Sequence, residues 1–79
     1  GDSSAARERR TLRARYRLID AATGTVLVDD TAAADAGIDR VSSNFAVVAA
    51  ETTALERLST DIARQISARL ARYARTAKG

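Results

Sequence analysis

The sequence contains no cysteine, histidine, proline, methionine or tryptophan. Without cysteine and histidine, the chain cannot form disulfide bonds, Cys/His zinc sites, a thiol nucleophile or an imidazole acid/base pair. These missing side chains exclude most familiar enzyme classes, so we expect neither catalysis nor a cofactor. Aromatic residues make up only 4% of the chain, so the core must be built from leucine, isoleucine, valine and alanine.

The 79 residues are enough for one small domain, with 46% hydrophobic and 29% charged residues. Thirteen basic and ten acidic residues give a net charge of +3, and they are interleaved, so a nucleic-acid partner is not expected. The sequence has neither an apolar run of about 18 residues nor a secretory signal. Because it begins with Gly1 instead of methionine, we expect a chain processed or excised from a longer one.

The sequence divides into three segments. Residues 1–10 (GDSSAARERR) are small, polar and charged without periodicity, which predicts a disordered tail. Residues 11–76 are predicted to form a single α+β domain or half-domain. Residues 77–79 are predicted to be a frayed C-terminus.

A β-hairpin is predicted from the alternation of apolar and charged residues that starts at Thr11. This period of two is typical of a half-buried strand, whose apolar positions are Leu12, Ala14, Tyr16 and Leu18. Residues 20–24 (DAATG) predict a four-residue loop in which Gly24 has a positive φ. Residues 25–34 then form the returning strand, with Asp29 or Asp30 opposite Arg15 depending on the register.

The end of the second strand is less regular. Residues 35–37 (DAG) are predicted to break it, and residues 38–41 would continue it past a kink or bulge. The serine and asparagine residues at 42–44 are good helix N-caps.

A long C-terminal helix is predicted from apolar residues spaced three or four apart. This stripe consists of Leu55, Leu58, Ile62, Ile66, Leu70 and Tyr73. The helix would start near Ser43, because alanine is frequent from residue 46 onward, and end near Arg75. The alternative is a start near Thr53, which would leave residues 45–50 as a third short strand.

These elements predict an α+β fold in which an antiparallel hairpin packs against one long C-terminal helix as an incomplete two-layer sandwich. Two strands under one helix leave strand edges unpaired. We therefore expect the chain to form a homodimer, most simply a twofold one.

The candidate binding residues are arginines. Arg13, Arg15 and Arg17 alternate along the first strand, which would project three guanidinium groups about 7 Å apart from one face, suited to phosphate. The other interpretation is a solvated, edge-protecting face. Arg40 joins the candidates on charge alone. The remaining acidic cluster is interpreted as solvated rather than as a cation site and comprises Asp29, Asp30, Asp35 and Asp39.

Three sequence stretches together resemble the C-terminal half of LptE, the lipopolysaccharide-assembly lipoprotein, of the alphaproteobacterial type. They are Y-R-L-x-D-x-x-T-G at residues 16–24, A-G-I-D-x-V-x-S at 36–43 and T-A-L-E-R-L…D-I-A-x-Q-I-x-A-R-L at 53–70. The resemblance extends over residues 12 to about 75.

The resemblance implies a non-enzymatic lipoprotein at the periplasmic face of the bacterial outer membrane. Its implied partners are the outer-membrane β-barrel lipopolysaccharide translocon, which it would plug or help to assemble, and lipopolysaccharide. The family fold would have two helices on a small sheet, so this sequence would lack the acylated cysteine, the first strand and the first helix. Two alternatives remain: an auxiliary lipoprotein of an ABC-type lipid transport system, and a module that binds nucleic acid or another anionic polymer.

Overall fold

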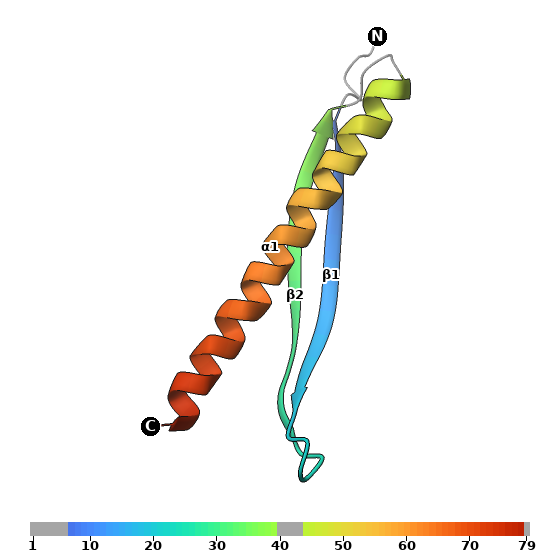
Figure 1. The fold of residues 1–79 in the computed structure, drawn as a ribbon. Coiled ribbons are helices and arrows are strands. Elements are labelled where there is room, and N and C mark those ends of the chain that lie inside the picture. The colour runs from blue at the N-terminus through green and yellow to red at the C-terminus, as the bar shows by residue number, and fades with distance from the viewer. Residues whose placement is uncertain (1–6, 40–43, 79) are drawn as a thin grey trace.

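The chain forms one hairpin and one helix (Figure 1). The computed structural model describes residues 7–39 and 44–78, which form β1 (Arg7–Ile19), β2 (Val26–Asp39) and α1 (Asn44–Lys78). β1 and β2 pair antiparallel in a two-stranded sheet, and α1 runs along one face of it. The structure therefore confirms the predicted α+β fold.

β1 begins earlier than the sequence predicted. It starts at Arg7, so residues 7–10 belong to the sheet and not to the expected tail. Their backbone pairs with the end of β2, with Arg7 opposite Asp39 and Arg10 opposite Ala36. The ladder hydrogen bonds and the cross-strand contacts offset the entropy of ordering these charged residues, which composition alone could not indicate.

β2 is longer and straighter than predicted, because residues 35–37 continue the strand. The predicted break there is wrong, since the ladder is regular at Asp35 and Gly37 and its one irregularity lies near the turn, between Leu18 and Ile19. A Cβ atom on Gly37 would lie 3.0 Å from Nη2 of Arg7. Gly37 thus marks the close approach of a side chain rather than a kink.

The hairpin loop has the predicted turn chemistry. The amide of Gly24 donates to the carbonyl of Asp20 at 2.7 Å, and the amide of Asp20 donates to the carbonyl of Thr25 at 2.8 Å. Oδ1 of Asp20 accepts a further bond from the amide of Ala22 at 2.9 Å. Gly24 has a φ of 78°, the positive value that glycine adopts without strain. The loop therefore reverses the chain where the sequence predicted.

A thin core lies between α1 and the sheet. The strand residues that face α1 are the even-numbered ones, which confirms the predicted apolar face of β1. The most buried side chains are all aliphatic and come from β2 and α1: Val28, Ala32, Ile38, Ala54, Leu58 and Ile62. Because these side chains are small or medium-sized, the helix and the sheet are held by little apolar area.

Three predictions about the helix need correction. Leu55 is 55% exposed, because Ala54, about 100° away around the helix, occupies the position over the sheet. The alternative third strand is wrong, since α1 is already helical at Phe45. The helix also extends to Lys78, beyond the predicted end near Arg75.

Candidate functional site

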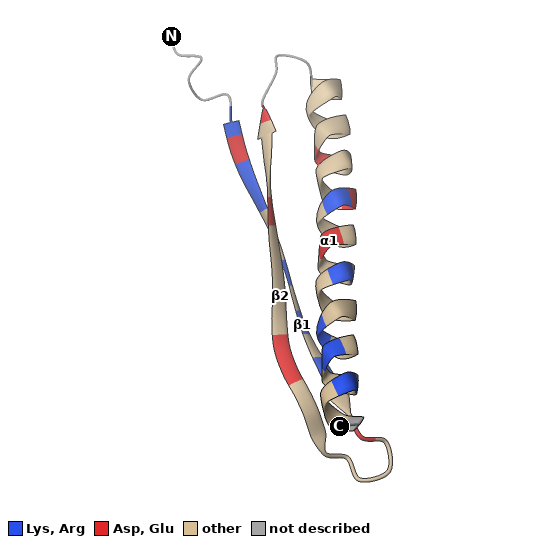
Figure 2. Cartoon of the chain, turned by 90° about the vertical axis from the view of Figure 1, so that its left-hand side faces the viewer, with Lys and Arg blue, Asp and Glu red and all other residues tan. Residues whose placement is uncertain are grey.

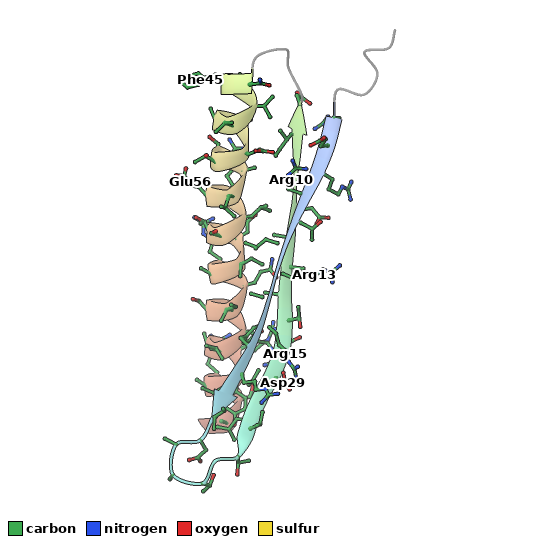
Figure 3. All side chains as sticks on the ribbon, turned by 90° about the vertical axis from the view of Figure 1, so that its right-hand side faces the viewer. Arg10, Arg13, Arg15, Asp29, Phe45 and Glu56 are labelled. Atoms are coloured by element: carbon green, nitrogen blue, oxygen red, sulfur yellow. The ribbon has the colours of Figure 1, made fainter. Side chains whose placement is uncertain are left out.

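The face of the sheet turned away from α1 carries a row of arginine side chains. They alternate along β1 and all are exposed, as Figure 3 shows for Arg13 and Arg15. Figure 2 shows that the acidic residues of the hairpin gather instead on β2. We call the following residues the arginine row: Arg7, Arg9, Arg13, Arg15 and Arg17.

The register decides which aspartate meets the row. Neither Asp29 nor Asp30 lies opposite Arg15, whose partner is Thr31, so the predicted register is wrong. Asp29 lies opposite Arg17, and Arg15 reaches it diagonally with a bidentate contact, Nε to Oδ1 at 3.0 Å and Nη2 to Oδ2 at 2.9 Å. The Nε atom of Arg17 is 3.7 Å from Oδ2. The carboxylate of Asp29 thus forms ion pairs with two guanidinium groups.

This arrangement changes the acidity of both partners. The hydrogen bonds from Arg15 lower the pKa of Asp29, and the nearby charges of Arg15 and Arg17 add to that effect against the desolvation of the carboxylate. The same hydrogen bond raises the pKa of Arg15. The lowered pKa favours the ionised form of Asp29, whose single negative charge offsets part of the positive charge of Arg15 and Arg17.

The other end of the row is also paired with aspartates. Nε of Arg7 lies 3.6 Å from Oδ1 of Asp39, and Nη1 of Arg9 lies 3.5 Å from Oδ2 of Asp35. Thr11 donates to the same Asp35 carboxylate at 2.8 Å. All these groups are exposed, so each pair stabilises the sheet only weakly, but each compensates a positive charge.

Arg13 differs from the rest of the row. It lies opposite Ala33, and it has no carboxylate partner within residues 7–39 and 44–78. Its guanidinium is exposed in the middle of the sheet, with its hydrogen-bond donors open to solvent. Of the three arginines predicted to bind a ligand, Arg15 and Arg17 are therefore paired with Asp29, whereas Arg13 is not. Arg40, the fourth predicted residue, lies outside the described residues.

Sequence reasoning missed the polar contacts between the sheet and α1. Nη2 of Arg10 lies 2.7 Å from Oε2 of Glu51, and Nε of Arg69 lies 3.6 Å from Oδ2 of Asp30. Nε2 of Gln65 donates to the carbonyl of Ala33 at 2.9 Å. Residues 7–10 show no apolar periodicity, so the sequence does not indicate that the strand extends upstream and places Arg10 on the inner face.

The acidic residues of β2 are divided between the two faces of the sheet. Asp29, Asp35 and Asp39 contact the arginine row, whereas Asp30 contacts α1. No group of three or more acidic side chains within the described ranges is arranged to hold a metal ion. In the same part of the chain, no helix is both long and apolar enough to cross a membrane.

Comparisons with known proteins give one match. The family model for LptE, described as lipopolysaccharide-assembly, matches residues 1–70. No curated protein and no solved structure matches the chain. The matched residues include all of β1 and β2, the arginine row and most of α1. The chain therefore belongs to the LptE family of lipopolysaccharide-assembly proteins.

Proposed function

We propose that this chain is a non-enzymatic structural part of the lipopolysaccharide translocon at the periplasmic face of the outer membrane, where it plugs or helps to assemble the β-barrel. Membership of the LptE family implies a role in lipopolysaccharide assembly, and this family is outer-membrane associated and non-enzymatic. The match over residues 1–70 is the observation that carries the proposal.

The dimensions of the chain support a plug. Its Cα atoms extend over 59 × 20 × 15 Å, so the unit is a narrow rod. Barrels of about 16 strands or more enclose an open lumen, and larger ones hold a plug. A rod with this cross-section would fit lengthwise into such a lumen, with α1 and the arginine row facing opposite walls.

A second part of the proposal concerns lipopolysaccharide itself. The lipid carries phosphates, and arginine binds phosphate with short, charge-assisted and often bidentate hydrogen bonds. In the arginine row, Arg13 is the group whose charge no described carboxylate compensates. We assign the phosphate contact to Arg13, with Arg15 and Arg17 as neighbours that strengthen the local positive field.

The two alternatives have less support. The family match favours lipopolysaccharide assembly over an auxiliary lipoprotein of ABC-type lipid transport. A nucleic-acid site needs several uncompensated cations along a phosphate backbone. Arg7, Arg9, Arg15 and Arg17 are instead each within ion-pair distance of an aspartate.

Photo-crosslinking in cells would test the plug. A photoreactive amino acid would replace Thr60, which is exposed on α1, or Arg13 on the opposite side of the molecule, in the full protein. We expect adducts with the outer-membrane barrel from both positions, because a plug meets the wall on opposite sides. Leu58, which is 3% exposed, serves as the buried control. The absence of barrel adducts from both exposed positions would refute the plug.

A further inference from the structure

The two ends of the chain differ in charge. We call residues 13–33 and 62–78 the loop end, because they lie next to the hairpin loop, and residues 7–12, 34–39 and 44–61 the far end (Figure 1). The loop end has eight basic and three acidic residues, whereas the far end has four basic and six acidic residues. The described part of the chain is therefore positive at one end and negative at the other.

Contacts between the sheet and α1 hold the segments of each end together. At the loop end, Nε of Arg69 on α1 lies 3.6 Å from Oδ2 of Asp30 on β2. At the far end, Nη2 of Arg10 on β1 lies 2.7 Å from Oε2 of Glu51 on α1. The charge difference is therefore a property of the folded chain, because each end is built from segments that are distant in the sequence.

Most of the basic residues at the loop end lie on α1. From Ile62 to its last residue, this helix contains four arginines, one lysine and no acidic residue (Figure 2). Ile62 is buried against the sheet. At about 100° per residue, Arg64 and Arg75 lie about 200° and 220° around the helix from Ile62, and both are exposed. The side of α1 that is turned away from the sheet is therefore basic along its second half.

The charges of Arg64 and Arg75 are not compensated inside the described structure. Neither guanidinium has a carboxylate within ion-pair distance in residues 7–39 and 44–78. The negative end of the helix dipole attracts cations, but this effect falls off within the last turn. It accounts for Arg75 and not for Arg64, which lies fourteen residues before the end of α1. Internal stabilisation of α1 therefore does not explain the whole basic side.

We propose that the outward side of α1 at the loop end, around Arg64 and Arg75, contacts acidic side chains on the lumen wall of the outer-membrane barrel. Guanidinium groups form short, charge-assisted hydrogen bonds with carboxylates, and complementary charges fix the register of an interface. This inference rests on the proposed function and adds the orientation of the plug to it. The loop end lies at the level where the wall of the lumen is acidic.

The length of the basic side favours a barrel wall over a layer of lipid headgroups. Arg64 and Arg75 are eleven residues apart, which corresponds to about 16 Å along the helix. A plug that lies lengthwise in the lumen holds α1 roughly perpendicular to the membrane. A headgroup layer is only about 5–8 Å thick, so it would meet one of the two arginines. The wall of a barrel runs parallel to the plug and has a polar inner surface, so it can contact both.

The outward side of α1 stays accessible if a longer chain adds elements to this two-layer fold. A second helix on the same face of the sheet would pack beside α1, at an interaxial distance of about 8–10 Å. Additional strands would extend the sheet below both helices. Neither addition covers the side of α1 that is turned away from the sheet.

Charge reversal in the full protein tests the proposal. Arg64→Glu combined with Arg75→Glu should lower the amount of barrel that co-purifies at low salt by roughly tenfold, because two attractions become repulsions. The matched control is Arg9→Glu combined with Arg57→Glu, which changes the net charge equally at two exposed positions of the far end. This control should co-purify like the wild type. Lysine at positions 64 and 75 should retain most of the barrel, and circular dichroism should show that all variants are folded.

The outcomes distinguish this inference from the plug itself. If the wild type gives barrel adducts and the reversed variant co-purifies with the barrel equally well, the plug stands and the acidic wall is refuted. If the reversed variant retains the barrel but loses labelled lipopolysaccharide, the partner of α1 is a lipid phosphate, which also overturns the proposal. If the wild type gives no barrel adducts, the plug and the acidic wall fail together.

Discussion

Arg10 on β1 and Glu51 on α1 form a direct ion pair between the sheet and the helix. Nη2 of Arg10 donates to Oε2 of Glu51 at 2.7 Å, across 41 residues of sequence, and lies 2.9 Å from Oε1 of Glu8. The hydrogen bond to Glu51, followed by that to Glu8, raises the pKa of Arg10. Because the aliphatic core is thin, this contact helps to fix α1 over the strand ends.

The Arg10–Glu51 contact should be detectable as coupling between two substitutions. Glu51→Gln and Arg10→Gln should each lower the urea midpoint of unfolding slightly, because both groups are only partly buried. The stability lost by the double variant should be smaller than the sum of the losses in the two single variants. This coupling energy should decrease at high salt. Strict additivity at low salt would show that the pair does not stabilise the fold.

Replacement of Ile62 by aspartate should unfold the chain. Ile62 is 6% exposed between α1 and the sheet, and a carboxylate there would have no partner. We expect a loss of about 3 kcal/mol or more, a large part of the stability of a small domain. Circular dichroism melting would measure it, with Ala63→Asp at the exposed neighbouring position as the control. A normal transition for Ile62→Asp would contradict the assignment of this face of α1 to the core.

Asp29 should contribute to loss of stability in acid. Its pKa is lower in the folded chain than the ordinary value of 3.8, chiefly because of the hydrogen bonds from Arg15. The stabilisation is therefore fully present above the ordinary value and is lost as the pH falls through the folded value. Urea midpoints between about pH 5 and pH 2 should fall less steeply for Asp29→Asn than for the wild type. The control Asp61→Asn, at an exposed helix position, should follow the wild type.

The Arg13 assignment predicts a selective loss of lipopolysaccharide binding. Arg13→Gln should weaken the binding of fluorescently labelled lipopolysaccharide by roughly tenfold, the usual effect of one charge-assisted contact. Lysine at this position should restore only part of it, because it lacks the planar fork. Circular dichroism and melting should be unchanged.

Two controls make the Arg13 experiment specific. Arg9→Gln removes an arginine that Asp35 already compensates, so this variant should bind nearly as well as the wild type. Dephosphorylated lipopolysaccharide should bind wild type and Arg13→Gln alike. If Arg13→Gln binds phosphorylated lipopolysaccharide as the wild type does, the arginine row is a solvated face.

Local pattern alone predicted the elements and their order. The period of two from Leu12 to Leu18, the positive φ at Gly24 and the helical spacing from Leu58 onward each follow from the geometry of a single element. Such features depend only on residues a few positions apart, so they can be predicted from a single sequence without knowledge of the tertiary structure. The sequence also placed Arg13, Arg15 and Arg17 on one face, because side chains alternate along any strand.

Tertiary structure decided which charges are compensated. Asp29 and Asp30 are adjacent in sequence and of the same residue type, yet they lie on opposite faces of the sheet. The register, which the turn and the core fix, places Asp29 beside the arginine row and Asp30 beside α1. The Arg10–Glu51 contact likewise depends on how α1 is rotated over the sheet. The availability of Arg13 is thus a property of long-range pairing, which no local pattern in the sequence specifies.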